Sequence, residues 1–551
     1  MSKLSKLRKN PGMFLKDMIL NVKKQPSNNI VKVEKKVSSL AQKKATPAKP
    51  TTKVCKNVMK TPQEYLKELT IFSSNFDVNS MLYREEKIWP YLRQHLWVQL
   101  YLLGLGKAQG RKLDPYRLQL GTAKHFPNYV RPKYQKLLDI KEIDELEQIN
   151  IDFLFLTVVN ASEQVLLSDG SIYNRITDPV YEAAANIGVA KKIELIKVRS
   201  DALYKCRKYK FKPDFIYPPS IFTSGYSYDI NYHYKFEDVL KKCIPSIDCS
   251  LDGVNNMFDW ELHTKAYYKQ ILKKYNPKIL LVNGFHYHAP LLSAADELGI
   301  LTVDIQHGIQ IGWNPLYNNW NEMPSEGYSS VPRRFLVWGE KEKDHINSVF
   351  CSNQHKAIVG GYPWLTKQLD YLDKIESTIL SKIQKYKKVV LVMLQNQKKF
   401  PELYLTLIKN SGDEILWVVR NHPKGSKFSR KDLNGIDGKN VLMGDYFDKI
   451  SLARLFQVAD ICLSEGSTVA IEADHYGVIN CLNGSEGYEN YREEIDNGMF
   501  FHISSSAEFY AICDDDSLFT KESRTNSFSN VSIENVMSEL LRSCNNSEGK
   551  E

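Results

Sequence analysis

The sequence has few cysteines, and none is paired at the spacing of a metal or redox motif. Nine cysteines are spread singly along 551 residues, without a CxxC pair. An odd number of isolated cysteines is typical of reduced thiols and provides no zinc ligand set. The sequence therefore predicts neither a disulfide framework nor a zinc site.

Long apolar runs are also missing. The longest nearly uncharged apolar stretch, residues 96–106, is shorter than the ~18 to 20 residues that a membrane-spanning helix needs. The N-terminal segment is rich in lysine and lacks the compact apolar core of a cleavable signal. We therefore expect a cytoplasmic protein without a transmembrane span.

Excess positive charge is confined to the N-terminus. The whole chain carries a net charge of +10, yet residues 1–60 hold sixteen Lys or Arg against two acidic residues, which gives +14. The rest of the chain is therefore slightly acidic, with a net charge of −4. A nucleic-acid-binding surface on the folded part is not supported, so no nucleic-acid partner is expected.

The basic N-terminal tail contains one pattern typical of a helix. Asn10 and Pro11 resemble a helix start, and apolar residues follow at helical spacing, flanked by lysines. A basic amphipathic helix in residues 1–24 would lie on an anionic membrane surface, which predicts contact with the inner face of the cytoplasmic membrane. A solvated arm, or a helix packed on its own protein, is the alternative. The composition of residues 25–60 indicates a flexible linker.

The remaining chain has the composition of a globular protein, with 43% hydrophobic and 25% charged residues. From residue 151, apolar strand patterns alternate with amphipathic helix patterns, which predicts parallel sheets covered by helices. The strand patterns before the turn signal at 360–363 are IDFLFLTVVN, KKIELIKV, PKILLVNG, LTVDIQHG and RFLVWG; those after it are KKVVLVMLQ, EILWVVRNHP, NVLMGD, DICLSEGS and VINCLNG. We therefore predict two doubly wound α/β domains, residues 61–362 and 363–551, behind a basic tail of residues 1–60.

Several familiar catalytic motifs are absent from the sequence. It has no GxxxxGK[ST] phosphate loop, no HExxH and no GxSxG. In open α/β sheets, ligands bind beyond the carboxyl ends of the strands. The residues that end the predicted strands are therefore the candidates for chemistry.

The strand EILWVVRNHP ends in polar residues. His422 can donate to a phosphate oxygen, Arg420 adds positive charge, and Pro423 ends the ladder pairing. The alternative is a histidine that only satisfies a turn.

The strand DICL leads into a small hydroxylated loop and then a helix. This loop places backbone N–H groups and the hydroxyls of Ser464, Ser467 and Thr468 toward a phosphate, with Gly466 between them. Their alternative role is helix capping. Glu472, one turn into the helix, would accept hydrogen bonds from a ribose or sugar hydroxyl, or else is a solvated carboxylate.

In the first predicted domain, His307 follows the strand LTVDIQ and precedes a glycine that leaves room for substrate. A neutral imidazole suits a general base near pH 7. A structural histidine is the alternative. Asp169, in the loop after IDFLFLTVV, could replace His307 as the base, as could its neighbours Glu163 and Asp178, although such carboxylates are often solvated or capping.

Three of these segments together resemble a known group of enzymes. QHG at 306–308, RNHP at 420–423 and SEGSTVAIEADHYG at 464–477 resemble bacterial glycosyltransferases of the GT-B fold that act in capsule and lipopolysaccharide biosynthesis. CDP-glycerol glycerophosphotransferases and bacterial sialyl- or polysialyltransferases look most similar. KLRKNPGMFLKD near the N-terminus also resembles the openings of capsular polysaccharide enzymes.

The resemblance implies a GT-B-like fold, in which two Rossmann-like domains face a cleft. Residues 61–362 would form the acceptor-side domain, and residues 363–551 would bind the nucleotide donor. His422 and Pro423 would bind donor phosphate or nucleotide, and His307 would be the general base. Ser467 and Thr468 would hold the phosphates. The sequence lacks the Asp/Glu-Asp/Glu-Gly motif of sialyltransferases, which leaves the donor and the base open.

The sequence therefore predicts a metal-independent glycosyltransferase without a cofactor. It would move a sugar or polyol phosphate from a CMP-, CDP- or UDP-linked donor to a glycan or lipid-linked acceptor of a growing surface polysaccharide. A nucleotide-sugar epimerase or hydrolase of the same fold, or a non-catalytic polysaccharide-assembly protein, is the alternative. The predicted catalytic residues are His307 and Asp169; the predicted donor-binding residues are Arg420, His422, Pro423, Ser464, Gly466, Ser467, Thr468 and Glu472.

Overall fold

The structure is a computed structural model, and it describes most of the chain beyond the basic tail. The described residues are 62–83, 85–104, 140–158, 163–195, 208–216, 242–245, 251–311, 314, 316–318, 320, 323–395, 397–422, 425–436, 438–520 and 522–548. The predicted membrane-binding helix in residues 1–24 and Pro423 of the predicted phosphate site lie outside these ranges. Both therefore stay predictions.

A helical pair opens the described part of the chain. Helix α4 (Pro62–Asn75) packs on α5 (Trp89–Gly104), and a short antiparallel ladder of β1 (Leu82–Tyr83) and β2 (Glu86–Lys87) connects them. The rings of Phe72 and Trp89, one from each helix, lie 5.5 Å apart. This pair shares its apolar core with the first large sheet, whose buried residues belong to the same cluster.

The first large sheet has eight strands, and all of its pairings are parallel. Its order is β12-β11-β10-β9-β4-β7-β8-β3. The strands are β3 (Ile140–Lys141), β4 (Ile151–Val158), β7 (Ala190–Leu195), β8 (Asp214–Ile216), β9 (Pro277–Asn283), β10 (Leu301–Ile305), β11 (Arg334–Val337) and β12 (Lys356–Val359). The chain builds outward in one direction from β4 and in the other from β9, so the topological switch point lies between these two strands.

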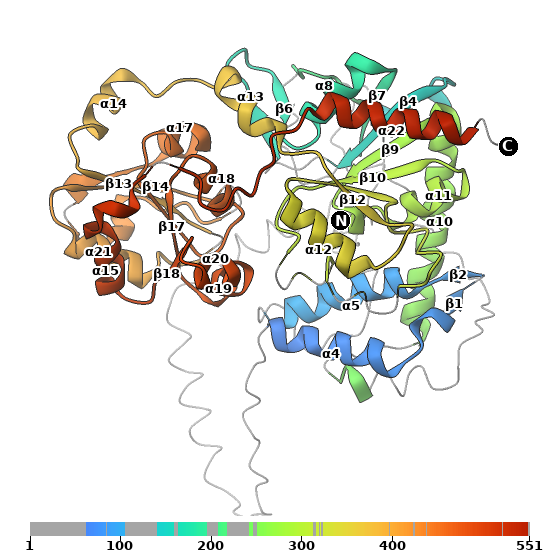
Figure 1. The fold of residues 1–551 in the computed structure, drawn as a ribbon, viewed down its shortest axis with the longest axis horizontal. Helices are drawn as coiled ribbons and strands as arrows, with labels where there is room; N and C mark the ends of the chain where they lie inside the picture. The colour runs from blue at the N-terminus through green and yellow to red at the C-terminus, as the bar shows by residue number, and fades with distance from the viewer. Residues whose placement is uncertain are drawn as a thin grey trace, which may run out of the picture. The chain divides into compact units, whose positions relative to one another are not determined.

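Helices and a hairpin connect the strands of the first sheet (Figure 1). They are α8 (Asp178–Ile187), α10 (Leu251–Tyr275), α11 (Ala289–Glu297), α12 (Glu340–Phe350) and the antiparallel hairpin of β5 (Gln164–Leu166) and β6 (Ile172–Asn174). Neighbouring side chains of one strand point to opposite faces of the sheet and belong to two different apolar clusters, as Leu154 and Phe153 of β4 do. Because both faces of the sheet are covered, its strands read as nearly continuous apolar runs.

The second sheet has six parallel strands in the order β15-β14-β13-β16-β17-β18. They are β13 (Lys388–Met393), β14 (Ile415–Arg420), β15 (Val441–Met443), β16 (Ile461–Ser464), β17 (Ile479–Leu482) and β18 (Phe501–His502). Numbered along the chain this order is 3-2-1-4-5-6, the order of a dinucleotide-binding α/β sheet. Its switch point lies between β13 and β16, where Met393 pairs with Ser464.

The helices around the second sheet are shorter. They are α14 (Ser377–Ile383), α15 (Glu402–Asn410), α16 (Asp445–Lys449), α17 (Leu452–Phe456), α18 (Val469–His475), α19 (Ser485–Asn490), α20 (Arg492–Asp496) and α21 (Ser506–Asp514). Helix α13 (Pro363–Tyr371) precedes them; it contacts both α8 and α17, and its Trp364 and Leu365 belong to the core of the first sheet. Apolar clusters again cover both faces of the sheet. The predicted fold class, two doubly wound α/β sheets on a GT-B-like plan, is confirmed by these topologies.

The chain returns to the first sheet at its C-terminal end. Helix α22 (Ile533–Glu548) packs on α8 and on β9, although α8 lies far away in the sequence (Figure 1). Asp474 of α18 fixes the segment that leads there: its carboxylate accepts hydrogen bonds from Ser523, from the backbone N–H of Arg524 and from Thr525. The predicted boundary at 362–363 stays a prediction.

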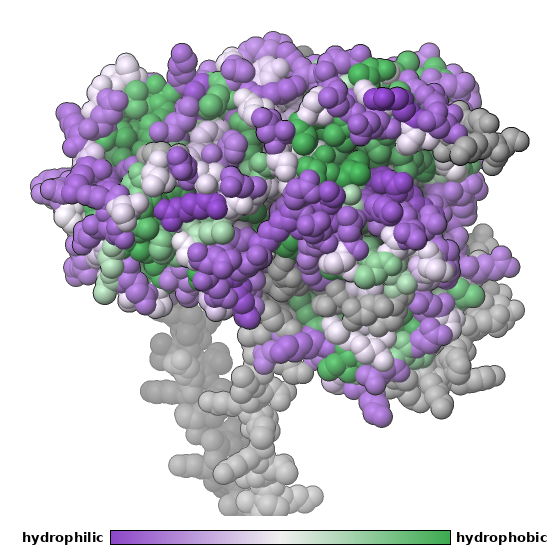
Figure 2. All heavy atoms as spheres, viewed as in Figure 1, coloured by the Kyte–Doolittle hydropathy of each residue, from purple (hydrophilic) through white to green (hydrophobic). Residues whose placement is uncertain are grey.

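The described surface is mixed in polarity. Figure 2 shows hydrophilic residues over much of the face in view, with apolar areas between them. Within the described ranges, no helix combines the length and the apolar character that crossing a membrane would require.

Candidate active site at the strand ends of the two sheets

The switch point of the first sheet gathers polar side chains. Asn283 ends β9, and its amide donates to Glu163 Oε2 at 2.9 Å. Asn174, at the end of β6, donates to the same oxygen at 3.3 Å. Glu163 is 7% exposed. A carboxylate from the loop after β4 is therefore held in place by two amides at the edge where a ligand of this sheet would bind.

His307 lies at the same edge, just beyond β10. Its ring is 6.3 Å from that of His286, and a Cβ on Gly284 would lie 3.2 Å from its Cε1. Gly284 has a φ of +71°, a conformation that favours glycine, so both the space and the backbone require this residue. The loop after β9 and the loop after β10 therefore touch at the imidazole.

The environment of His307 keeps its imidazole neutral. Burial lowers its pKa below the ordinary value, the charge of Glu163 opposes this, and the charge of Arg175 acts in the same direction as burial. The Nδ1 atom is buried and has no hydrogen-bond partner among the described residues. A neutral imidazole is suited to accept a proton.

The residues next to His307 hold its loop in place. The buried amide of Gln306 accepts a hydrogen bond from Trp338 N at 2.7 Å and donates to Gly308 O at 3.0 Å. Asp304 points elsewhere, accepting from Phe285 N at 3.0 Å, and burial raises its pKa to about 8. Asp304 therefore does not orient the His307 imidazole.

Asp169, the alternative base, lies apart from this group. Its Oδ1 accepts hydrogen bonds from the backbone N–H and the hydroxyl of Ser171, and its Oδ2 pairs with Lys208 at 3.1 Å. These hydrogen bonds lower its pKa to about 2. The carboxylate therefore caps the turn between β5 and β6. A base role for Asp169 stays a prediction that its contacts do not favour, and Glu163 is the carboxylate whose charge acts on His307.

The second sheet presents its hydroxylated loop at its own switch point. Ser464 ends β16 with no exposed surface, and its Oγ has no hydrogen-bond partner among the described residues. Gly466 has a φ of +122°, which only glycine adopts readily. Thr468 precedes α18 but makes no side-chain cap hydrogen bond, and Ser467 Oγ accepts from Val469 N only at 3.4 Å. Helix capping therefore leaves the Thr468 hydroxyl unused.

The end of β14 carries the predicted cationic group. Arg420 donates through Nη1 to the carbonyl of Ile450. Burial lowers its pKa to about 10, an effect that Asp448 opposes and the charge of Arg175 reinforces. His422 is half-buried, and its carbonyl accepts from Gly425 N at 3.0 Å.

Asn421 explains why this strand end has a fixed shape. Its amide exchanges hydrogen bonds with the backbone of Phe428, and Asp448 accepts from both its backbone N–H and its amide. The amide therefore closes the loop that contains His422.

Glu472 does not face solvent. Its carboxylate is 6% exposed and accepts from Arg175 Nη1 at 2.9 Å. The same nitrogen donates to the hydroxyl of Tyr362 at 3.1 Å. Sequence reasoning missed Arg175 because it follows a three-residue strand and belongs to no recognisable motif.

The strand ends of the two sheets meet. A Cβ built on Gly308 would lie 3.7 Å from Thr468 Oγ1. The Arg175–Glu472 ion pair also joins the two sides, because Arg175 follows β6 beside the first sheet and Glu472 lies in α18 beside the second. The structure therefore brings together the predicted base loop, the hydroxylated loop and Glu472, and adds Arg175 and Glu163; Asp169 stays outside this set.

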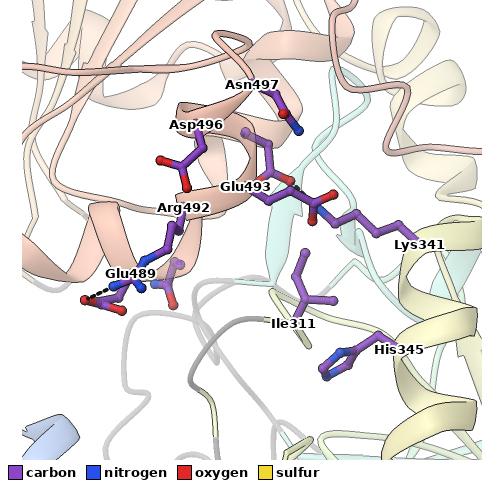
Figure 3. A pocket seen from close by; sticks show the side chains of 10 residues that line it. Ile311, Lys341, His345, Glu489, Arg492, Glu493, Asp496 and Asn497 are labelled. Atoms are coloured by element: carbon purple, nitrogen blue, oxygen red, sulfur yellow. Dashed lines mark hydrogen bonds and ion pairs between the residues drawn. The ribbon is translucent and has the colours of Figure 1, made fainter.

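A cavity of about 600 Å³ lies between α12 of the first sheet and the α19–α20 segment of the second. Its lining residues are Ile311, Lys341, His345, Glu489, Asn490, Arg492, Glu493, Glu494, Asp496 and Asn497. Figure 3 shows Lys341 extending toward Glu493, with which it pairs at 2.7 Å. Its volume falls within the ~300 to 1,000 Å³ range of ligand sites, and carboxylates outnumber cations in its lining.

No family model matches this chain, and no curated protein matches it. Solved structures give distant similarities. The complex of MnaA from S. aureus with UDP is 12% identical, covers 72% of this chain and 97% of its own, and has a TM-score of 0.45. The UDP-GlcNAc 2-epimerase from Neisseria meningitidis is 13% identical, with coverages of 71% and 100% and a TM-score of 0.42. The calicheamicin glycosyltransferase is 12% identical, with coverages of 72% and 95% and a TM-score of 0.41. Similarities at this level carry no conclusion about activity.

Proposed function

We propose that this protein is a glycosyltransferase that moves a sugar or polyol phosphate from a nucleotide-activated donor to a glycan acceptor of a surface polysaccharide. One observation carries the proposal. A strand-end histidine of one α/β sheet and an unused hydroxyl of a second sheet lie in adjoining loops, with Gly308 and Thr468 in contact distance. A base and a phosphate-binding loop are the two parts that such a transfer requires.

The donor would bind at the switch point of the second sheet. Arg420 and His422 would donate to the phosphate oxygens from the end of β14, and Ser467 and Thr468 from the loop after β16. Charge-assisted hydrogen bonds to phosphate are stronger than neutral ones. In sugar transfer the bond from the anomeric carbon to the phosphate oxygen breaks, and in polyol phosphate transfer the P–O bond of the diphosphate bridge breaks. In both cases the departing nucleotide gains negative charge, which these donors stabilise.

The acceptor would approach from the first sheet. The His307 imidazole takes the proton of the acceptor hydroxyl as the acceptor oxygen forms the new bond, to the anomeric carbon of a sugar or to the phosphorus of a polyol phosphate. The electron pair of the broken bond leaves with the nucleotide.

Nucleotides should stabilise the folded protein. We expect one of CMP, CDP, UDP or GDP, at about 100 times its dissociation constant, to add about 2.7 kcal/mol to the free energy of unfolding. Differential scanning calorimetry of the purified chain measures this as a higher melting temperature. No shift with any nucleotide or its sugar conjugates would contradict the proposal. Consumption of a nucleotide sugar without an acceptor would instead favour the epimerase or hydrolase alternative.

The hydroxyl of Thr468 should contribute to nucleotide binding and not to stability. Because this hydroxyl makes no cap hydrogen bond, Thr468→Val should leave the melting temperature unchanged. Loss of a hydrogen bond to a charged phosphate, worth about 1.5 to 3 kcal/mol, should weaken nucleotide affinity roughly 10- to 100-fold in calorimetric titration.

A serine that does cap a helix provides the matched control for this experiment. Ser451 accepts from Arg454 N at 3.2 Å at the start of α17. Ser451→Ala should cost about 1 kcal/mol of stability and leave nucleotide affinity intact. Equal affinities of Thr468→Val and the unaltered protein would remove Thr468 from the site.

A further inference from the structure

Arg175 is fixed in position by contacts from both sheets. Its backbone N–H donates to the carbonyl of Glu163 at 2.9 Å, which ties it to the switch point of the first sheet. Its Nη1 donates to Glu472 of α18 at 2.9 Å and to the Tyr362 hydroxyl at 3.1 Å. A guanidinium held by a carboxylate and a phenol loses little further freedom when it binds a ligand.

Most donors of this guanidinium have no partner among the described residues. Arginine carries five N–H donors, and all recorded side-chain hydrogen bonds of Arg175 to described residues leave from Nη1. The side chain is 24% exposed, so the other donors can be reached. The second arginine of the site, Arg420, also uses only Nη1 toward a described residue, the Ile450 carbonyl.

The two arginines lie within electrostatic reach of each other. The charge of Arg175 adds to burial in lowering the pKa of Arg420. Like charges destabilise each other. Among the described residues the Glu472 carboxylate forms its ion pair with Arg175, and its charge only partly offsets the effect of burial on Arg420. A phosphate or diphosphate that accepts from both guanidinium groups would relieve this repulsion, and its oxygens match the planar fork of an arginine.

We infer that Arg175 is a donor-phosphate ligand supplied by the first domain, and that Glu472 and Tyr362 orient its guanidinium for this role. The inference deepens the proposed function and rests on it. It assigns the first domain a part in donor binding, in addition to carrying the base. The ligand class is a nucleoside mono- or diphosphate, recognised by Arg175 through its phosphate oxygens.

The test compares nucleotides with their nucleosides. We expect Arg175→Ala to lower the affinity for the bound nucleotide roughly 10- to 100-fold in calorimetric titration, and to leave the affinity for the corresponding nucleoside unchanged. Arg175→Lys should lie between, because lysine keeps the charge and loses the fork. A merely structural role would lower both affinities together.

Another arginine that joins distant segments is the matched control. Arg454 donates through Nη2 to the carbonyls of Leu369 and Leu372. Arg454→Ala should lower the melting temperature while the ratio of nucleotide to nucleoside affinity stays unchanged. The same ratio in Arg175→Ala as in the unaltered protein would overturn the inference and leave the proposed function standing.

Inorganic pyrophosphate separates the inference from the proposed function. A protein that binds pyrophosphate through Arg175, and no nucleotide, would contradict the donor role while retaining an anion site. A protein that binds neither would overturn both. If Arg175→Ala weakens the binding of both nucleotide and pyrophosphate, the result supports the inference and the proposed function together.

Discussion

Replacement of His307 by alanine should lower kcat about 10²- to 10⁴-fold, the usual contribution of a general base. Nucleotide affinity should change little, because the proposed phosphate ligands come from other loops. The measurement is steady-state kinetics with the donor identified by nucleotide binding, together with calorimetric titration of that nucleotide. A fully active variant would shift the base role to a carboxylate, and Glu163 is the one whose charge acts on His307.

The pH dependence of the rate provides a second readout for His307. Burial lowers its pKa below the ordinary value, so the imidazole is neutral and active across the neutral range. The rate should fall only on the acid side, as pH drops through this lowered pKa and the base becomes protonated. If the rate of His307→Gln no longer falls at acidic pH, the fall seen in the unaltered protein is due to protonation of His307. A rate that instead falls as pH rises through neutrality would contradict a neutral base.

A buried structural histidine is the matched control. His355 is 1% exposed; its Nε2 accepts from Tyr328 N at 3.0 Å, and its Nδ1 lies 2.8 Å from the Pro332 carbonyl. His355→Gln should lower the free energy of unfolding by about 1 to 3 kcal/mol. Its kcat, and the fall of its rate at acidic pH, should match those of the unaltered protein. The contrast separates a histidine that accepts a substrate proton from one that satisfies a loop.

The fold was predictable because its dominant signal is local. Segments such as PKILLVNG and KKVVLVMLQ are too apolar for a strand with one solvent-exposed face, so each predicts a doubly covered parallel strand. The strand order was not predictable, since β4 and β9 pair across more than one hundred intervening residues. Nor was the return of α22 to α8, because an amphipathic helix pattern does not name the surface that it covers.

The site was partly predictable for the same reason. His307 and Thr468 were found because each follows an apolar strand, and strand ends converge in such sheets. Arg175 and Asn283 were missed because their roles depend on side chains from remote segments. Asp169 and Glu163 looked equivalent in sequence, as carboxylates of one loop region. Their separation depends on the β5–β6 hairpin, whose turn uses Asp169 as a cap while Glu163 stays at the switch point.

A buried charge cluster beside the site should produce the largest stability effect. Lys192 of β7 pairs with Asp178 at 2.6 Å and with Glu194 at 3.1 Å, and all three side chains are 2 to 3% exposed. Lys192→Met should lower the free energy of unfolding by about 3 to 5 kcal/mol, because it leaves two carboxylates buried without their cation. Chemical denaturation at neutral pH measures this loss. Lys191, the half-buried neighbour on the other face of β7, is the control, and Lys191→Met should change stability by about 0.5 kcal/mol or less.

The destabilised variant should recover stability on acidification, and this distinguishes charge from packing. Burial already raises the pKa values of Asp178 and Glu194, and the Lys192 charge opposes that rise; without the lysine both pKa values should rise further. A folded state whose carboxyls have raised pKa values binds more protons than the unfolded state, so stability falls as pH rises through that window. Relative to the unaltered protein, Lys192→Met should therefore regain stability as the pH is lowered from neutrality. A deficit that stays constant with pH would mean that Lys192 stabilises β7 by packing alone. The triple variant that combines Lys192→Met with Asp178→Asn and Glu194→Gln should show no recovery on acidification, since no ionisable group of the cluster is then left.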